Sequence, residues 1–232
     1  TDTVTANTTA VRVLIDHHLH PPVDGYAVQF SDTHACSTSY IVYQLLEALA
    51  GTDAIDQAMA ESLYVGIMTD TGNFSFSSLT SDLFRAVAVL IDKGVNVPYV
   101  NSSVYNNFSE GRMRLLGYML NDKMVTDYEF GVAYVSLTEE EMRRFDFIQG
   151  DSEGFVNYPL SIRGIRMSAM FIQTKHSIRV SLRSRGEVDV NVFARRYFDG
   201  GGHRNAAGGK SYVPMNETLE NFRKYLREYF GA

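Results

Sequence analysis

Several protein classes can be set aside because their sequence features are missing. Cys36 is the single cysteine among 232 residues, which excludes an internal disulfide framework and favours a reducing, cytoplasmic setting. No apolar run approaches the roughly 20 residues that span a bilayer, so we expect no membrane partner. No internal repeat or low-complexity segment is visible. Hydrophobic residues make up 45% of the chain, which is enough for one large core or two modest ones.

Positive charge is scarce in the first two thirds of the chain. Residues 1–160 carry 8 Lys/Arg against 21 Asp/Glu, a balance of −13. Residues 161–210 reverse the sign, with 10 Lys/Arg against 3 Asp/Glu, a balance of +7, and residues 211–232 carry three of each. Scattered surface charge is one explanation. An acidic part that holds cations beside a basic part that holds anions would instead suit a phosphorylated substrate.

The hydrophobic pattern of the first part predicts one buried strand followed by helices. The apolar run 11–15 is β-branched and short, as expected of a strand. Ser37 or Thr38 can cap the first helix, and Gly94 can end the third. Helices are expected over 39–49, 54–68 and 82–93, after Pro98, and over 109–121.

The sequence after residue 124 has a different hydrophobic pattern, in which strands alternate with helices. This pattern predicts an α+β domain with an antiparallel or mixed sheet. A hairpin is expected at Gly131, and Thr138 opens a helix with acidic residues in its first turn. Strands are expected over 124–130, 132–137, 166–174 and 177–184, and helices over 189–197 and 216–230. The predicted fold class is therefore α/β with two domains, 1–108 and 124–232, joined by a helical linker over 109–123.

The first chemical motif is Asp16-His17-His18, at the end of the apolar strand. A strand that breaks off into ionisable side chains opens onto a site, and Asp and neutral His are common ligands of Mn, Fe and Zn. Side chains alternate along a strand, so one imidazole can bind a metal while its neighbour faces a substrate. A structural His pair is the alternative.

Asp70 belongs to a second motif, Thr69-Asp70-Thr71-Gly72-Asn73, at a predicted helix end. A carboxylate presented there, close to flexible glycines, can reach a metal held by the end of a strand. The alternative is that Asp70 and Asn73 only cap or turn the chain.

The third motif is the glycine-rich segment 199–209, which includes Gly201, Gly202 and His203. Exposed backbone N–H groups let a phosphate approach closely, and a helix expected after His203 would add its dipole. The segment is not a P-loop, because Gly-Lys-Ser/Thr does not follow at the required spacing. A flexible hairpin is the alternative.

Two further candidates lie in the second part of the chain. Alternation places Ser181, Arg183 and Arg185 on one face of a strand, which suits bidentate contacts to a phosphate or carboxylate. An exposed charged face of a half-buried strand would look the same. Asn157 is a weaker candidate that a turn or cap would also explain.

Together these motifs resemble the DHH phosphoesterase superfamily, and most closely its bacterial oligoribonuclease/pAp-phosphatase (nanoRNase-like) branch. The resemblance runs in order from residue 11 to about 210. It also rests on Ala35-Cys36-Ser37-Thr38, Glu153-Gly154-Phe155-Val156-Asn157 and Val188-Asp189-Val190-Asn191. It implies that the first domain is part of a parallel-sheet DHH domain. The second would be the DHH-associated, substrate-binding domain.

The resemblance also implies roles for individual residues. His17 and Asp70 would be metal ligands in a two-ion Mn or Mg centre, and His18 would contact the scissile phosphate. Asp16 would be a ligand or would orient the imidazoles. Arg183, Gly201, Gly202, His203 and Asn157 would bind the substrate. Metal-activated water would then attack a phosphodiester or phosphomonoester in line.

The sequence departs from the family pattern in one respect. The family has two further acidic motifs on strands before the Asp-His-His strand, and residues 1–10 contain only Asp2. We therefore expect the chain to be a fragment that binds a short RNA or a nucleotide but hydrolyses it poorly. A cyclic-dinucleotide phosphodiesterase and a non-catalytic nucleotide-binding module are alternatives, and a homodimer stays open.

Overall fold

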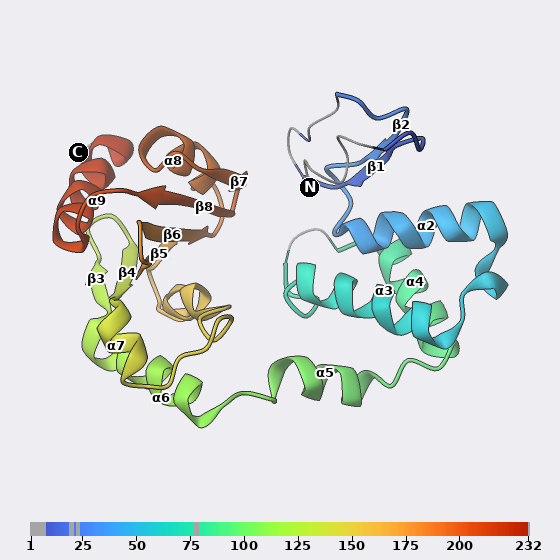
Figure 1. Cartoon of the computed structure of the whole chain (residues 1–232), viewed down its shortest axis with the longest axis horizontal. Coiled ribbons are helices and arrows are strands. Elements are labelled where there is room, and N and C mark those ends of the chain that lie inside the picture. Colours follow the sequence, from blue (N-terminus) through green and yellow to red (C-terminus); the bar gives the residue numbers. More distant parts are fainter. Residues whose placement is uncertain (1–7, 19–20, 22–23, 77–78, 232) are drawn as a thin grey trace. The chain divides into compact units, whose positions relative to one another are not determined.

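The computed structural model describes residues 8–18, 21, 24–76 and 79–231. The chain divides into two compact units, residues 1–107 and 108–232, and each is described here by itself (Figure 1). None of the helices in the described ranges combines the length and the apolar character that crossing a bilayer needs.

Among its described residues, the N-terminal unit contains a pair of parallel strands and the helices α2 to α5 (Figure 1). In the pair, Val13 of β1 lies beside Val28 of β2, and Asp16 lies beside Ser31. Its elements are β1 (Val13–Asp16), β2 (Val28–Ser31), α2 (Thr38–Ala50), the 3-10 turn η1 (Thr52–Ala54), α3 (Gln57–Asp70), α4 (Ser81–Asp92) and α5 (Val97–Tyr105). The expected fold was incomplete here, because β2 was not predicted. Its residues, Val-Gln-Phe-Ser, are too few for a periodic pattern to be visible.

Side-chain caps decide where these helices begin. The hydroxyl of Ser37 accepts a hydrogen bond from Tyr40 N, which confirms Ser37 rather than Thr38 as the cap of α2. Asp56 caps α3 and Thr80 caps α4 in the same way. Buried residues from α2 to α5 form one core, in which Cys36 also lies. This core fixes the end of α3, where Asp70 lies.

Gly66 of α3 is placed where α3 meets α2. A Cβ atom on Gly66 would overlap the side chain of Ser39. We therefore expect Gly66→Ala to force the helices apart and to lower the free energy of unfolding by about 1–3 kcal/mol. Gly117→Ala is the matched control, because a Cβ there meets no atom within 4 Å. This variant should raise the free energy of unfolding by about 0.5–1 kcal/mol, since alanine favours the helix more than glycine does. Urea unfolding followed by circular dichroism measures both, and a fully stable Gly66→Ala variant would contradict the packing.

The C-terminal unit is built on a six-stranded mixed sheet in the order β3-β4-β5-β6-β8-β7. β4 and β5 are parallel, and the other neighbouring strands are antiparallel. The strands are β3 (Val125–Asp127), β4 (Val132–Leu137), β5 (Met167–Gln173), β6 (Ile178–Ser184), β7 (Gly201–His203) and β8 (Ala206–Ser211). The helices are α6 (Glu110–Tyr118), the π-helical η2 (Met119–Lys123), α7 (Glu139–Arg143), the 3-10 helix η3 (Phe155–Ser161), α8 (Val190–Tyr197) and α9 (Met215–Phe230).

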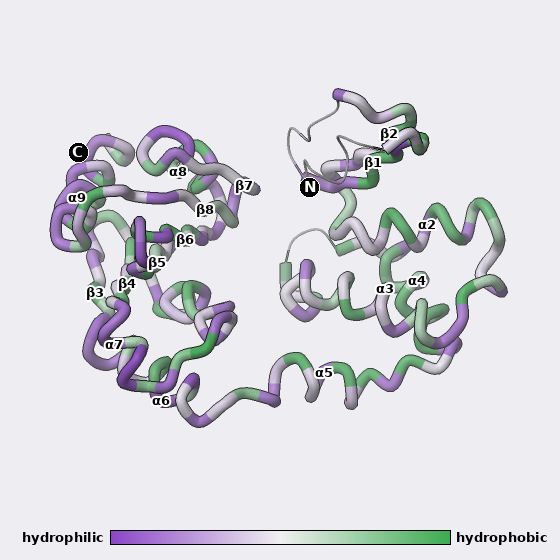
Figure 2. The backbone as a smooth tube through the Cα atoms, in the orientation of Figure 1, coloured by the Kyte–Doolittle hydropathy of each residue, from purple (hydrophilic) through white to green (hydrophobic). Residues whose placement is uncertain are grey.

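The two faces of the sheet are covered by different elements. On one face, Phe171 of β5 and Leu182 of β6 pack in a core with Phe193 of α8 and Phe222 of α9. α9 packs one side against this core, through Phe222 and Leu226, and Figure 2 shows hydrophilic residues along much of its tube. On the other face, β4 and β5 pack against Leu115 of α6 and against η2 and η3. The segment 109–123, predicted as a linker, thus contributes to the core of this unit.

Glu141 ties the π-helical segment η2 to α7. Its carboxylate accepts hydrogen bonds from Lys123 Nζ at 2.5 Å, Tyr118 OH at 2.7 Å and Thr138 N at 2.8 Å. Thr138 also caps α7, which completes the predicted capping box. Burial acts to raise the pKa of Glu141, but these hydrogen bonds outweigh burial and lower the pKa from 4.5 to about 2.

This lowered pKa predicts a pH-dependent contribution to stability. A depressed carboxyl pKa stabilises the fold above the unfolded-state value of 4.5, and the stabilisation is lost as pH falls towards 2. We expect Glu141→Gln to lower the free energy of unfolding by about 1–3 kcal/mol at pH 7. The difference from the wild type should shrink below pH 4.5. Urea titrations at pH 7 and pH 3 test this, and an equal difference at both values would contradict it.

The prediction of a helix after His203 is wrong. The chain instead turns at Arg204 and Asn205 into strand β8, so β7 and β8 form an antiparallel hairpin. The segment is therefore a hairpin, and its glycines allow tight strand pairing. A Cβ on Gly200 would overlap the carbonyl oxygen of Gly208, and one on Gly209 would come too close to Phe198.

Candidate functional site

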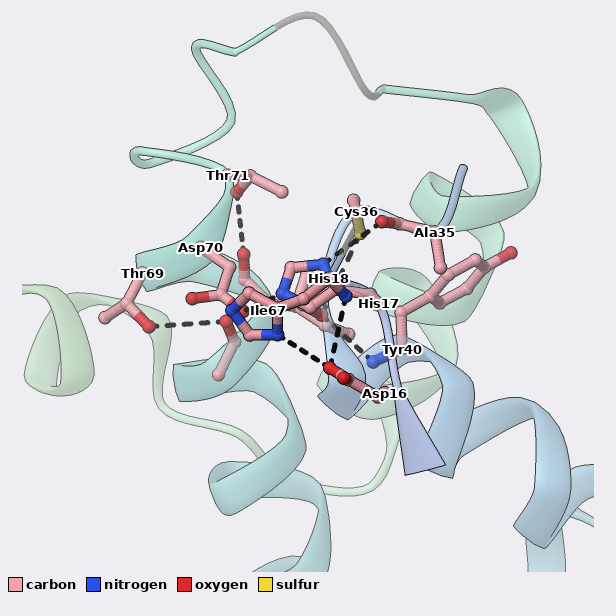
Figure 3. A network of polar contacts seen from close by, with 12 residues as sticks. Asp16, His17, His18, Ala35, Cys36, Tyr40, Ile67, Thr69, Asp70 and Thr71 are labelled. Atoms are coloured by element: carbon pink, nitrogen blue, oxygen red, sulfur yellow. Dashed lines mark hydrogen bonds and ion pairs between the residues drawn. The ribbon is translucent and has the colours of Figure 1, made fainter. Parts of the chain in front are cut away.

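His17 follows the last residue of β1, at the carboxyl end of the two parallel strands, where open α/β sheets bind ligands. Its Nδ1 atom lies 3.3 Å from the carbonyl oxygen of Ala35. Its Nε2 atom lies 3.7 Å from Oδ2 of Asp70. Figure 3 draws both side chains. A backbone carbonyl on Nδ1 favours the tautomer that leaves Nε2 as the acceptor or metal-binding nitrogen.

Asp70 is the last residue of α3, and the turn that follows holds it in place. Thr71 donates its hydroxyl hydrogen to the carbonyl of Ile67 at 2.7 Å and accepts a hydrogen bond from Phe74 N at 3.1 Å. Gly72, Asn73 and Phe74 all have positive φ, between 56° and 58°. The predicted turn and the predicted ligand position therefore coexist. The Asp70 side chain keeps 46% of its surface exposed.

Asp16 and His18 form a second pair at the same strand end. Oδ1 of Asp16 lies 2.6 Å from His18 Nδ1 and accepts a hydrogen bond from His18 N at 3.1 Å. Burial acts to raise the pKa of Asp16, but its hydrogen bonds with His18 outweigh burial and hold the pKa below the ordinary value. The rings of His17 and His18 meet edge to face, with centroids 4.7 Å apart. Asp16 is thus placed to orient His18.

The donor set of this strand end fits a divalent metal ion. A carboxylate oxygen and an imidazole nitrogen converge within 3.7 Å, and the imidazole is oriented from its far side by a carbonyl. Carboxylates suit Mg and Mn, and imidazole suits Fe and Zn as well. His17 and Asp70 are the residues that would hold the ion.

Arg183, in the C-terminal unit, lies on β6 and is half-buried. Its Nη1 atom donates to the carbonyl of Leu182 at 2.9 Å. Burial lowers the pKa of the guanidinium, while the nearby charge of Glu153 opposes the shift. A poorly solvated cation gains from an anionic ligand. Asn157 is exposed on η3, which packs over β5 and β6.

Gly201, Gly202 and His203 make up strand β7 at the edge of the sheet. Gly202 has a φ of 150°, and a Cβ there would come 2.5 Å from the carbonyl oxygen of Ala206. Sequence reasoning assigned no role to Asn191, whose side chain contacts this strand. Its oxygen accepts a hydrogen bond from Gly202 N at 3.0 Å. The Val188–Asn191 motif was visible, but the contact depends on how α8 packs against β7.

Comparison with known proteins shows which family the chain is similar to. Residues 128–232 match the model of the DHHA1 domain. The bifunctional oligoribonuclease and PAP phosphatase NrnA of Bacillus subtilis is 32% identical over 85% of this chain. These similarities support a DHH-superfamily protein with a DHH-associated domain. The resemblance inferred from the motifs is thereby confirmed, including the DHH-associated domain at the C-terminal end.

Two further proteins are also similar to the chain. The crystal structure of an exopolyphosphatase-related protein from Bacteroides fragilis is 38% identical and has a TM-score of 0.91, over 97% of this chain and 65% of that one. The cyclic-di-AMP phosphodiesterase GdpP of B. subtilis is 28% identical over 94% of this chain and 32% of its own. The chain spans 62% of the length of B. subtilis NrnA. The α/β fold class is confirmed by the structural likeness.

Proposed function

We propose that the protein is a metal-dependent phosphoesterase that hydrolyses short oligoribonucleotides, 3′-phosphoadenosine 5′-phosphate (pAp), or both. The observation that carries the proposal is the convergence of His17 Nε2 and Asp70 Oδ2 within 3.7 Å, with His17 Nδ1 oriented by Ala35. The similarity to NrnA of B. subtilis supports the choice of substrate class.

In this proposal the residues at the strand end have two roles, which are metal binding and phosphate contact. His17 and Asp70 hold Mn²⁺ or Mg²⁺. When bound, such an ion supplies Lewis-acid stabilisation and an activated water. Asp16 accepts a hydrogen bond from Nδ1 of His18 and so orients the ring, and the imidazolium form of His18 can donate from Nε2 to a phosphate oxygen.

The C-terminal unit supplies substrate binding in this proposal. Arg183 and the β7 residues Gly201, Gly202 and His203 would contact a phosphate, and Asn157 a second part of the nucleotide. The balance of +7 over residues 161–210 supports an anionic ligand. No aromatic ladder suited to long single strands is present in the sequence, which favours a short ligand. A cytoplasmic setting and a homodimer stay predictions.

Calorimetry with pAp and the dinucleotide pApA, with and without Mn²⁺, tests the proposal. Turnover or Mn²⁺-dependent binding would support a phosphoesterase. Equal binding with and without Mn²⁺, and no turnover, would contradict it and favour a nucleotide-binding module. Cyclic di-AMP is the third ligand because of the similarity to GdpP. Tighter binding of cyclic di-AMP than of pAp and pApA would favour a cyclic-dinucleotide phosphodiesterase.

A further inference from the structure

We propose that the amide nitrogen of Asn191 donates a hydrogen bond to a phosphate group of the nucleotide ligand. The inference rests on the proposed function and adds a binding residue to it. Asn191 is the second residue of α8 and is 9% exposed. It lies beside β7, the strand that carries Gly201, Gly202 and His203.

The orientation of the Asn191 amide is fixed by two donors. Its Oδ1 atom accepts a hydrogen bond from Gly202 N at 3.0 Å and another from Arg195 Nε at 3.1 Å. Both partners can only donate, so the atom that they contact must be the amide oxygen. The amide nitrogen is therefore the other atom, directed away from these two donors.

The amide nitrogen of Asn191 carries two N–H groups that can donate hydrogen bonds. Within the part of the chain that the structure describes, it donates no hydrogen bond. In the same part, the fully buried side-chain atoms without a partner are Ser168 Oγ and Tyr197 OH, so the Asn191 nitrogen still reaches solvent. A nearly buried amide with two unmet donors is costly unless a water or a ligand accepts from it.

The surroundings of this amide favour an anion. The Arg195 guanidinium is held next to it through Nε, which leaves its two other nitrogens for a second oxygen. Gly201 adds no side chain that would obstruct an approach. The carboxylate of Asp189, which caps α8, accepts hydrogen bonds from the backbone N–H groups of Asn191 and Val192. A phosphate oxygen matches both the donor and the charge.

Asn205 lies in the turn of the same hairpin, and its amide nitrogen, unlike that of Asn191, donates to oxygens of the protein. Its nitrogen contacts Ser184 Oγ at 2.9 Å, Gly186 O at 3.3 Å and Val188 O at 3.4 Å. All of its donors are thus used within the protein. Asn205 is a structural residue by this measure, which makes it the matched control for Asn191.

The test compares Asn191→Asp with Asn205→Asp. In Asn191→Asp a carboxylate still accepts from Gly202 and Arg195, so thermal unfolding should match the wild type. The lost donor and the added charge should raise the dissociation constant for pAp at least about tenfold. Asn205→Asp loses donors to three protein oxygens and should lower the Tm by about 4–8 °C. Calorimetry and thermal unfolding are the two readouts, and pAp is the probe.

Each outcome decides the inference. The weakened binding of Asn191→Asp should persist in 0.5 M KCl, because salt screens distant repulsion but does not restore a hydrogen bond. Binding that recovers fully in salt, or wild-type pAp affinity in Asn191→Asp, would overturn the inference and leave the proposed function intact. If Asn191→Asp does not fold, the assignment of Oδ1 as the acceptor is contradicted, and the inference is overturned as well. A wild-type chain that does not bind pAp would overturn the proposed function, and the inference with it.

Discussion

Replacing Asp70 by alanine is expected to lower the affinity of the chain for Mn²⁺ by more than about 100-fold. Changes in residues that only orient metal ligands cost 10- to 100-fold, so the loss of a direct ligand should exceed that range. The fold should survive, because Asp70 lies at the end of α3 with 46% of its side chain exposed. Titration of Mn²⁺ followed by electron paramagnetic resonance measures the affinity.

Asp92→Ala is the matched control for Asp70→Ala. Asp92 is the last residue of α4 and is exposed, so its replacement also removes a carboxylate from a helix end. We expect its Mn²⁺ affinity to stay within about twofold of the wild type, because a distant exposed charge is screened by salt. Equal losses in both variants would show that Mn²⁺ responds only to net charge. Wild-type affinity in Asp70→Ala would contradict the assignment of Asp70 as a ligand.

Replacing Arg112 by methionine is expected to destabilise the C-terminal unit by about 2–4 kcal/mol. Arg112 is 7% exposed, and its guanidinium donates to the carbonyls of Asp151 and Glu153, the latter at 2.9 Å. It also lies over the rings of Phe108 and Phe155, 4.0 Å and 4.8 Å from their centroids. Methionine fills the space but leaves two carbonyls without a donor. Urea unfolding followed by circular dichroism gives the change.

Arg114→Met provides the comparison on the same helix. Arg114 is exposed and pairs with Glu110 one turn earlier, an interaction expected to contribute less than about 0.5 kcal/mol. We also expect Arg112→Lys to fail as a replacement, because an ammonium lacks the planar fork that reaches two carbonyls. If Arg112→Met unfolds at the same urea concentration as Arg114→Met, the buried contacts of Arg112 carry little free energy.

Local sequence signals were sufficient wherever a structural element depends on its own residues. The capping box at Thr138 and Glu141, the cap at Ser37 and the ends of most helices follow from side chains within three or four residues of each other. The apolar runs that form β5 and β6 were also readable, because they are long enough to show their pattern.

The failures share one physical cause, which is dependence on distant contacts. β2 is a four-residue strand stabilised by pairing with β1, and it is too short for its pattern to stand out in the sequence. A helix was expected after His203, but pairing with β6 and β7 holds residues 206–211 as strand β8. Arg112 lies in the segment predicted as a helical linker, although the loop carbonyls that it contacts lie 39 and 41 residues away.

The sequence by itself determined the superfamily, the α/β class and the identity of the candidate ligands, because Asp16-His17-His18 and the Asp70 turn are contiguous motifs. Only the tertiary structure decided that His17 and Asp70 meet at 3.7 Å, that Ala35 orients His17, and that Asn191 contacts Gly202. These contacts join segments 11 to 53 residues apart. Their geometry is set by how α2, α3 and α8 pack, and no local pattern encodes that packing.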